Sequence, residues 1–374
     1  MKKQKKMKIK IRKNSMYKVG IIGLGFLGGS LAKSLRATDI VDEIIAFDKN
    51  LESLKLAKNE NVIDDYSEKI DDKFYSCDIV FICTPVKLIP EIAKELDEVV
   101  NENCIITDTG STKKNIIETS KYLKHEFIGG HPMVGSERSG YQTSKELLFE
   151  NSYYIITKSE KTTQRALDIL KEIISAIKAI PIIIDEDKHD YITATISHVP
   201  HVIAYSLVSL VKQLDDENET MKNLAAGGFK DITRIASSDP EMWENICSEN
   251  KEEILKILSI FKNIINQFEQ GISNSETTYN FFAESKKYRD SFINKRINGN
   301  TMPELNINIK DENGAIATIT TILSAKNISI RNLEILNNRE NNYGALKIIF
   351  NTYEQMQEAQ DLLKQFGYEV KENI

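Results

Sequence analysis

The sequence predicts a doubly wound α/β domain, followed by an all-helical domain and a small α+β domain. Three observations lead to this order. Short apolar runs alternate with helix-like stretches over the first half of the chain. Strand signals then give way to long helical runs, and they return after residue 303. We therefore place the first domain at residues 17–186, the helical domain at 187–297 and the last domain at 303–374.

Length and composition fit this organisation. The chain has 374 residues, of which 41% are hydrophobic and 28% charged, as in a soluble globular protein of two or three domains. The four cysteines show no CxxC spacing, which argues against a zinc or redox site and fits a reducing cytoplasm. No stretch reaches the ~18 apolar residues of a membrane span. We expect a cytoplasmic protein without a membrane partner.

Residues 1–16 form a basic tail. Its first 13 residues contain eight basic side chains and no acidic one, and no apolar segment of signal-peptide length follows. We expect a disordered tail, or a start-site extension before Met16. The formal net charge of the whole chain is −6, so the remainder is more acidic still and poorly suited to nucleic acid.

The strands of the first domain are predicted from short runs rich in β-branched residues. Helix-like spacers separate them, and this alternation predicts a parallel sheet. The first four predicted strands are Tyr17–Ile22, Glu43–Asp48, Asp78–Cys83 and Cys104–Asp108, and two later ones are Tyr153–Thr157 and Ile180–Ile184.

The helical domain is predicted from long runs such as Ile192–Lys212 and Lys251–Phe268, which Gly227-Gly228 and Asp239-Pro240 punctuate. Its apolar positions are too numerous for one solvent-facing layer of helices. A homodimer core is therefore expected in this domain.

A linker at residues 298–303 leads to the last domain. Its predicted order is strand, helix, strand, strand, helix, strand, which is the ferredoxin-like plan. The predicted elements are Glu304–Ile309, Ala315–Ala325, Ile328–Ile335, Tyr343–Phe350, Tyr353–Phe366 and Tyr368–Val370.

A glycine-rich turn, Gly23-Leu24-Gly25-Phe26-Leu27-Gly28, directly follows the first predicted strand and opens a helix. Gly23 permits the tight turn, Gly25 lets the backbone approach a pyrophosphate, and Gly28 lets helix and strand pack closely. The N–H groups of the helix start, at Phe26 and Leu27, would meet the pyrophosphate. This is the Rossmann-type pattern of a dinucleotide-binding domain, and its alternative is a turn used only for packing.

The acidic residue that this pattern requires is Asp48, at the end of the second predicted strand. Its carboxylate would accept hydrogen bonds from the ribose hydroxyls and would repel a 2′-phosphate, which favours NAD over NADP. The adjacent cation Lys49 leaves residual NADP use open.

Five further motifs follow one another in order. They are Cys83-Thr84-Pro85-Val86, the loop from Thr107 to Lys113, the segment from Gly130 to Gly140, His189-Asp190 with Ser197–His201, and Gly227–Arg234. Together they resemble the prephenate/arogenate dehydrogenase family over about residues 17–290. From Glu304 the chain resembles an ACT-type regulatory domain, with Asn313-Gly314-Ala315-Ile316-Ala317 as its glycine turn.

The resemblance implies an oxidoreductase that performs NAD-dependent oxidative decarboxylation of prephenate to 4-hydroxyphenylpyruvate, CO₂ and NADH in tyrosine biosynthesis. Hydride leaves C4 of the ring, the 4-hydroxyl loses its proton, and loss of CO₂ makes the ring aromatic. It also places Thr84, Pro85 and Asp108 at the cofactor.

His131 is the candidate general base, because a neutral imidazole titrates near working pH. It stands between a glycine pair and a proline, where we expect a loop at the carboxyl edge of the sheet. Ser111 would bind the same hydroxyl and orient the nicotinamide. The alternatives are a structural hydrogen bond for His131 and a helix cap near Lys113 for Ser111.

Four residues are expected to bind substrate. His201 would contact it, with His198 as a support or as a packed, hydrogen-bonded residue, and Arg234 would clamp a carboxylate unless it forms a surface ion pair with Asp231 or Asp239. Glu137 would gate the site or stand as a solvated carboxylate. No acidic or cysteine partner accompanies His198 and His201 at metal-ligand spacing, so no metal is expected.

In the last domain, Asn313, Gly314 and Ala315 are expected to form the turn where a free amino acid lies between two such modules. Asn327, Ile328 and Asn332 are weaker candidates for that pocket. L-tyrosine, the end product, is the expected allosteric effector. The alternative is a module that serves only dimerisation.

Two other functions remain open from the sequence. An arogenate dehydrogenase performs the same chemistry on a substrate with an amine in place of the side-chain keto group. A non-catalytic sensor would bind NAD and an amino acid without turnover, but the joint presence of His131, Ser111 and Arg234 argues against it. The first strand begins at Tyr17, so no fused chorismate mutase is expected.

Overall fold

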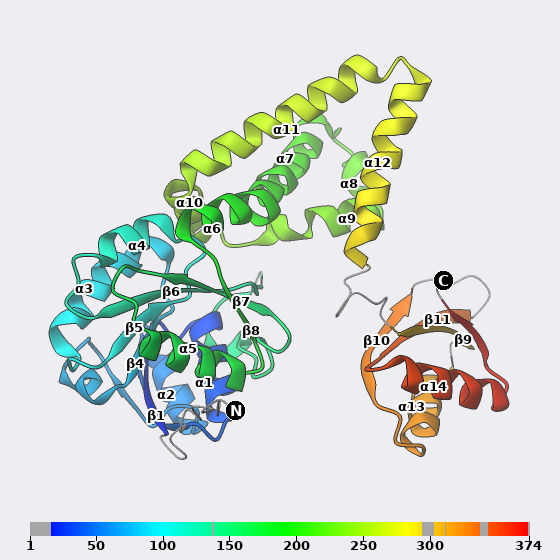
Figure 1. Ribbon diagram of the computed structural model, residues 1–374. Helices are drawn as coiled ribbons and strands as arrows, with labels where there is room; N and C mark the ends of the chain where they lie inside the picture. Colours follow the sequence, from blue (N-terminus) through cyan, green and yellow to red (C-terminus); the bar gives the residue numbers. More distant parts are fainter. Residues whose placement is uncertain (1–15, 137, 294–302, 311, 337–342, 373–374) are drawn as a thin grey trace, which may run out of the picture. The chain divides into compact units, whose positions relative to one another are not determined.

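The computed structural model describes residues 16–293 and 303–372, apart from residues 137, 311 and 337–342. The chain divides into two compact units, Met1–Ile264 and Ile265–Ile374, which are considered separately (Figure 1). The basic tail before Met16, most of the predicted linker and Glu137 lie outside the described residues.

An eight-stranded sheet forms the centre of the first unit, with the order β3-β2-β1-β4-β5-β6-β7-β8 (Figure 1). Its first six strands run parallel, and β7 and β8 form a parallel pair that joins β6 in the antiparallel sense. The prediction of a wholly parallel sheet is therefore wrong at β6–β7. The strands are β1 (Tyr17–Ile22), β2 (Val41–Phe47), β3 (Asp65–Ser67), β4 (Ile79–Ile82), β5 (Ile105–Asp108), β6 (Glu126–Pro132), β7 (Tyr153–Lys158) and β8 (Ile180–Ile183).

Two of these strands, β3 and β6, are absent from the sequence-based prediction. β6 contains Gly129-Gly130-His131-Pro132, which has the composition of a turn, yet close packing explains both glycines. A Cβ on Gly130 would lie 2.4 Å from the carbonyl oxygen of Asp108, and one on Gly129 would lie 2.9 Å from Cδ of Lys113. His131 therefore lies in a strand, in register with Ile155 of β7, and not in a loop.

Helices cover both faces of the sheet. One face packs against α1 (Phe26–Arg36), α2 (Leu51–Asn59) and α5 (Gln164–Ala176), and the other against α3 (Ile89–Val99) and α4 (Lys114–Ser120). Successive strand residues enter opposite cores, as Ile21 and Ile22 do, because side chains alternate along a strand. Two cores hold the strand ends, and with them the loops beyond, in place.

The helical run predicted at Ile192–Lys212 is interrupted. Helix α6 (Glu186–Thr193) passes into a π-helical turn at Ala194–His198 and then into α7 (Val199–Leu214). Pro200 has no N–H to donate to the carbonyl of Ile196 four residues earlier, so one bond of the regular ladder is lost here. Such π-turns are frequent at functional sites. The remaining helices are α8 (Thr220–Leu224), α9 (Gly227–Thr233), α10 (Pro240–Glu249) and α11 (Lys251–Gly271).

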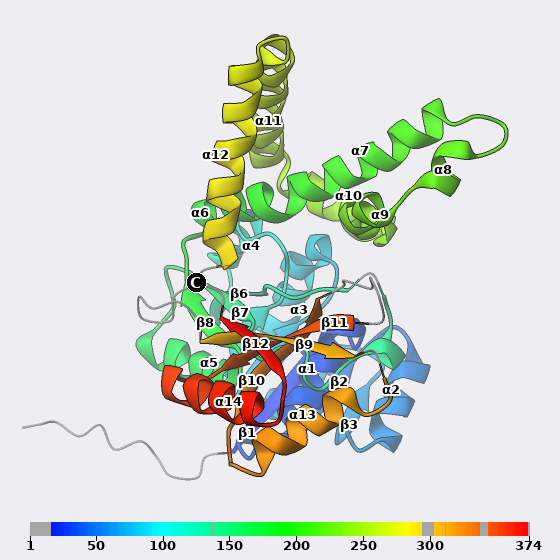
Figure 2. The ribbon, with the colours of Figure 1, turned by 90° about the vertical axis from the view of Figure 1, so that its right-hand side faces the viewer.

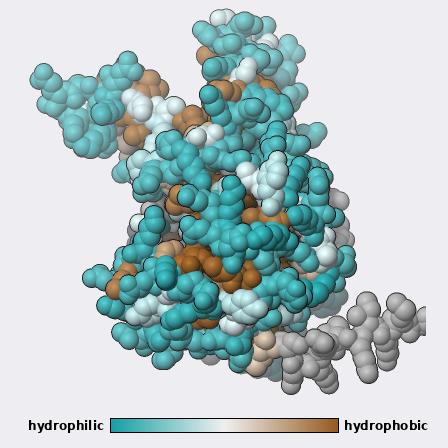
Figure 3. Space-filling model, turned by 90° about the vertical axis from the view of Figure 1, so that its left-hand side faces the viewer, coloured by the Kyte–Doolittle hydropathy of each residue, from teal (hydrophilic) through white to brown (hydrophobic). Residues whose placement is uncertain are grey.

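By length and composition, the run Glu186–Leu214 is also long and apolar enough to cross a membrane. The expectation that no stretch qualifies is wrong for this run. However, His189 and Asp190 near its start are buried in the fold, and other helices also carry exposed apolar side chains. Figure 3 shows brown apolar patches on a mostly teal, hydrophilic surface. A surface shared among helices is typical of a protein interface. Its members include Val208, Leu210, Leu214, Leu224, Ile232, Leu255 and Ile260.

The second unit contains the end of α11, helix α12 (Ser275–Ile293) and a four-stranded antiparallel sheet of order β10-β11-β9-β12 (Figure 2). α13 and α14 pack on this sheet around a core that includes Ile307, Ile319 and Leu363. The order along the chain is the predicted β-α-β-β-α-β: β9 (Glu304–Lys310), α13 (Ala315–Ser324), β10 (Ile330–Leu336), β11 (Tyr343–Phe350), α14 (Tyr353–Gln365) and β12 (Glu369–Glu372).

Candidate active site

The glycine turn lies between β1 and α1, as predicted. Gly23 adopts a φ of +93°, which strains any residue with a Cβ. A Cβ on Gly28 would lie 1.9 Å from the carbonyl oxygen of Gly23, whereas a Cβ on Gly25 would meet nothing within 4 Å. Gly23 and Gly28 are thus needed for the turn itself, and Gly25 leaves open space in front of the helix. That space suits the close approach of a pyrophosphate.

Helix α1 begins without a side-chain cap, because its N-cap residue is Gly25. The first-turn N–H groups, including those of Phe26 and Leu27, have no acceptor within the helix. Asp48 stands after β2 and accepts hydrogen bonds from the backbone N–H groups of Leu24, at 2.5 Å, and Asn50, at 2.7 Å. These contacts hold the carboxylate against the turn, where a ribose would lie beside a bound pyrophosphate.

Thr84 and Pro85 follow β4 at the same edge of the sheet. The methyl carbon of Thr84 lies 3.0 Å from the place where a Cβ on Gly23 would stand. The buried Oγ1 of Thr84 has no hydrogen-bond partner among the described residues. An orphaned hydroxyl beside an open glycine turn fits a site that a polar cofactor completes.

Asp108, at the end of β5, differs from the direct cofactor contact that the sequence suggests. Its side chain is fully buried, and protein donors occupy both oxygens. Oδ2 accepts from Nζ of Lys113 at 2.6 Å and from the N–H of Gly110 at 2.8 Å, and Oδ1 accepts from the N–H of Gly130 at 3.0 Å. The carboxylate therefore orders the loop after β5 against β6.

His131 belongs to a chain of buried hydrogen-bonding groups. Its Nδ1 lies 2.8 Å from Nε2 of His189, and Nδ1 of His189 lies 2.7 Å from Oδ1 of Asp190. The same carboxylate accepts from the backbone N–H groups of Lys113, at 2.8 Å, and Lys114, at 3.0 Å. His189 and Asp190 thus connect α6 to the start of α4 and to the candidate base.

The order of donors in this chain follows from Asp190. Burial disfavours its charge, but the hydrogen bonds from His189, Lys114 and Lys113 prevail and lower the pKa of Asp190. An ionised carboxylate only accepts, so Nδ1 of His189 donates and its Nε2 must accept from Nδ1–H of His131. The Nε2 atom of His131 is then left with a free lone pair.

Burial also decides the charge of His131. It lowers the pKa of His131 well below the usual value, and the charges of His189 and Lys113 add to that effect. The imidazole is therefore neutral at neutral pH and able to accept a proton at Nε2. The site therefore holds a neutral proton acceptor, and the lowered pKa departs from the expectation that this imidazole titrates near working pH.

Ser111 lies in the loop between β5 and α4, at the carboxyl edge of the sheet next to β6. The alternative role of Ser111 as a cap of α4 is wrong, because the N-cap residue is Lys113 and the helix start has no side-chain cap from it. Asp190 accepts from the first N–H groups instead. Ser111 is partly exposed, so its hydroxyl is available to a ligand.

The π-turn and α7 supply the other two predicted histidines. His198 is 1% exposed, and its Nδ1 lies 3.1 Å from Nδ2 of Asn250; burial lowers the pKa of His198 to about 4. His198 is therefore a packed, neutral support. His201 stacks on Trp243 with ring centroids 3.8 Å apart, and its Nδ1 donates to the carbonyl oxygen of Ser197 at 2.9 Å.

Arg234, on an exposed turn after α9, is close enough for its charge to lower the pKa of His201, although burial is the larger cause. Trp243 is buried, and its indole Nε1 has no hydrogen-bond partner among the described residues. His201, Arg234 and Trp243 thus form a second group of potential ligand contacts. Sequence reasoning missed Trp243, and the only signal was that it is the single tryptophan of the chain.

The effector residues predicted in the last domain do not gather in one place within a copy. Gly314, with φ of +88°, precedes α13, whereas Asn327 and Ile328 follow its end. A ten-residue helix is about 15 Å long, so these groups lie apart. Ile328 is 5% exposed in the core of the sheet, which contradicts a direct contact with an effector. Asn332 lies in β10, and its side chain accepts from the N–H of Leu333.

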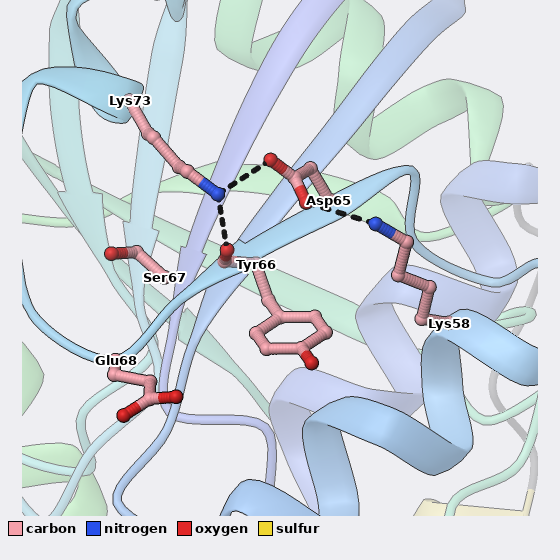
Figure 4. Close-up of a pocket in the computed structure, with 6 residues that line it drawn as sticks. All are labelled: Lys58, Asp65, Tyr66, Ser67, Glu68 and Lys73. Carbon is pink, nitrogen blue, oxygen red and sulfur yellow. Dashed lines mark hydrogen bonds and ion pairs between the residues drawn. The ribbon is translucent and has the colours of Figure 1, made fainter.

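A separate cavity of about 370 Å³ lies beside β3 (Figure 4). Asp65 lies between two lysines there, at 2.9 Å from Nζ of Lys58 and 2.7 Å from Nζ of Lys73. Tyr66, Ser67 and Glu68 complete the lining, and none of the six is a predicted site residue. These exposed ion pairs are typical of a solvated surface.

Comparison with known proteins relates this site to a family. Family models described as "Prephenate dehydrogenase, nucleotide-binding domain" and "Prephenate dehydrogenase, dimerization domain" match residues 31–183 and 185–287. Prephenate dehydrogenase of Bacillus subtilis is 33% identical over 351 residues, which are 92% of this chain and 95% of the relative. That of Lactococcus lactis is 33% identical over 360 residues, or 93% and 98%.

A solved structure gives the same result. Prephenate dehydrogenase from Aquifex aeolicus, crystallised with hydroxyphenyl propionate and NAD⁺, superposes with a TM-score of 0.72 and 33% identity. The match covers 75% of this chain and 100% of that one.

The glycine turn yields a paired test. Gly28→Ala should lower the free energy of unfolding by about 1–3 kcal/mol, because the new methyl group meets a backbone carbonyl. Gly25→Ala should leave that free energy within about 0.5 kcal/mol of wild type, since the site is open. It should nevertheless raise the Kd for NAD on the order of tenfold, or about 1.4 kcal/mol. Denaturant unfolding and calorimetric titration measure the two effects, and tight binding by Gly25→Ala would contradict the assignment.

Proposed function

This chain belongs to the prephenate dehydrogenase family, and from that premise we propose that it catalyses the NAD-dependent oxidative decarboxylation of prephenate to 4-hydroxyphenylpyruvate, CO₂ and NADH. The observation that carries the proposal is the hydrogen-bonded chain from Asp190 through His189 to His131, which leaves a neutral imidazole with a free Nε2. Such a base is what oxidation of a hydroxyl requires.

The dinucleotide would be held by the glycine turn, the first turn of α1, Asp48 and the threonine at the end of β4, all of which fit it. When bound, NAD supplies the acceptor for the hydride that leaves C4 of the substrate. The protein's own task is then to place C4, take one proton and hold two carboxylates.

His131 would accept the proton of the 4-hydroxyl at Nε2. As hydride leaves C4, the electron pair of the O–H bond forms the C4 carbonyl. When CO₂ leaves C1, the electron pair of that bond passes into the ring, and the carbonyl oxygen becomes a phenolate that takes back the proton from His131. Ser111 would donate a hydrogen bond to the same oxygen from the loop after β5. Nε2 of His189 accepts from Nδ1–H of His131, and Asp190 accepts from Nδ1–H of His189. The base therefore presents a single tautomer to the substrate.

The substrate carboxylates would meet cationic and polar groups on the helical side of the site. Arg234 can hold a carboxylate with two parallel hydrogen bonds. Nδ1 of His201 donates to Ser197, so Nε2 of this residue would donate to a carboxylate only in the protonated ring. His198 would support this region from the packed interior. Glu137, in the segment after β6, remains a proposed contact at the mouth of the site.

The helical part would form a homodimer. It matches the family's dimerization domain, and its exposed apolar residues on α7 to α11 would be covered by a second copy. The cytoplasm is the proposed location.

The last module is proposed to be an ACT-type domain that binds L-tyrosine and inhibits the enzyme. Three features support this assignment. Its elements follow β-α-β-β-α-β order, Gly314 makes a left-handed turn before α13, and the alignment with the Bacillus relative covers 92% of the chain and so reaches into this module. A pocket that included Asn313, Gly314, Asn327 and Asn332 would need residues from two modules.

The direct test is turnover. Purified protein with NAD should form NADH on addition of prephenate, and arogenate serves as the competing substrate.

His131→Asn should lower kcat on the order of 10²–10⁴-fold, because the base is lost while binding is kept. Absence of NADH formation with both substrates would refute the activity, and faster turnover of arogenate would make arogenate the substrate. A near-normal kcat in the His131→Asn variant would assign the role of base to another residue.

Arg234→Ala should mainly raise KM for prephenate, on the order of 10-fold or more, since it removes binding common to ground state and transition state. Steady-state kinetics measures the effect. Arg36→Ala is the matched control, because that arginine pairs with Asp64 and is the last residue of α1, at the opposite end of the helix from the glycine turn. An unchanged KM in the Arg234 variant would exclude the clamp.

L-Tyrosine should inhibit the full chain through the last module. Asn313→Ala should then shift the inhibition curve to higher tyrosine, on the order of tenfold for a lost bond of about 1.4 kcal/mol, with kcat in the absence of tyrosine unchanged. Titration of NADH formation with tyrosine provides the comparison. Equal inhibition of both proteins would assign tyrosine to the active site.

A further inference from the structure

Lys113 is a buried cation with every donor engaged. Its side chain is 0% exposed, and Nζ donates to Oδ2 of Asp108 at 2.6 Å and to the carbonyl oxygens of Gly110 and Thr112 at 2.8 Å each. An ammonium group has three protons, so all three are used. Lysine is rarely buried in proteins unless it is paired, so the complete burial of Lys113 together with its partners points to a specific role.

The partners of Lys113 surround Ser111. Gly110 and Thr112 are its two neighbours in the chain, so the ammonium holds the loop on both sides of the serine. The other oxygen of Asp108 accepts from the N–H of Gly130, the residue before His131. One ion pair therefore links the loop of Ser111 to the strand of His131.

The same lysine reaches the third part of the site through its backbone. Its N–H donates to Asp190 at 2.8 Å. Its side chain also passes close over β6, where a Cβ on Gly129 would lie 2.9 Å from Cδ. Gly129, two residues before the base, thus has a physical role: it makes room for this side chain.

Lys113 also acts through its charge. The ionisable groups that affect His131 are His189 and His198, from α6 and the π-turn, and Lys113, from the loop. Burial is the largest cause of the lowered pKa of both His131 and His189, and the Lys113 charge lowers both further. Asp190 and Asp108 oppose this at His189. The cation therefore favours the neutral, proton-accepting form of His131.

We propose that Lys113 is a positioning residue of the reaction, whose buried ammonium fixes Ser111 and His131 relative to each other so that one substrate hydroxyl meets both. This role rests on the hydroxyl oxidation proposed above. It predicts that loss of the ammonium lowers the rate of the chemical step without abolishing the binding of NAD or substrate.

Two variants test the role. Lys113→Met removes the cation but leaves the Asp108 carboxylate buried and unpaired, so Asp108→Asn/Lys113→Met, which removes both charges, is made in parallel. Lys73→Met is the matched control, because Lys73 also binds an aspartate and a backbone carbonyl, at Asp65 and Tyr66, outside the site (Figure 4). Thermal unfolding first establishes which variants are folded.

In the folded variants, kcat should fall on the order of 10–100-fold, with KM within about threefold of wild type. In Lys113→Met the acid limb of the kcat/KM profile should move to higher pH, since His131 loses a neighbouring positive charge while Asp108 keeps its own charge. The pKa of His131, followed by its NMR signals without NAD or substrate, should rise in the same sense. Lys73→Met should match wild type in all three measurements.

A folded double variant with wild-type kcat, or a loss confined to KM, would overturn the proposal. The NMR titration separates this outcome from failure of the proposed activity. If wild type oxidises no substrate, the activity is refuted, while an unchanged His131 pKa in folded Lys113→Met refutes the electrostatic influence of Lys113 by itself.

Discussion

A buried carboxylate, Asp190, is the point on which the candidate site depends. It accepts from the first two N–H groups at the start of α4 and from the imidazole of His189. Its charge is stabilised by these donors and by the positive end of the helix dipole. Because an ionised carboxylate can only accept, Asp190 determines which nitrogen of each following histidine carries hydrogen. Asp190 therefore sets which nitrogen of His131 carries hydrogen, through the intervening His189.

The same contacts explain how separate parts of the chain form one site. Asp190 stands near the start of the helical part, α4 and β6 belong to the sheet domain, and the ion pair of Lys113 with Asp108 joins the loop after β5 to β6. Burial lowers the pKa of His131 and thereby keeps it neutral, so the enclosed position of the base is part of its chemistry.

Sequence reasoning reached the class of fold and most residues with a local signature. The glycine turn and Asp48 have fixed spacing, and the structure bears out the steric need for glycine at Gly23 and Gly28. It failed where long-range packing decides the outcome. The glycines of β6 have the composition of a turn, yet they lie in a strand paired with β7. The side chains of Lys113 and Tyr154 and the backbone of Asp108 leave no room for a Cβ at these positions. The contacts of Asp190 with Lys113, of His189 with His131 and of Trp243 with His201 join residues far apart in sequence, so no local pattern predicts them.

The central claim is that Asp190 and His189 hold His131 as the tautomer with hydrogen on Nδ1 and a free Nε2. Nitrogen-15 NMR of the imidazole groups in the wild-type chain, compared with Asp190→Asn, measures this directly. We predict a neutral His131 at neutral pH with hydrogen on Nδ1, and a mixture of tautomers once Asp190 is neutralised. Hydrogen on Nε2 of His131 in the wild-type protein would contradict the account.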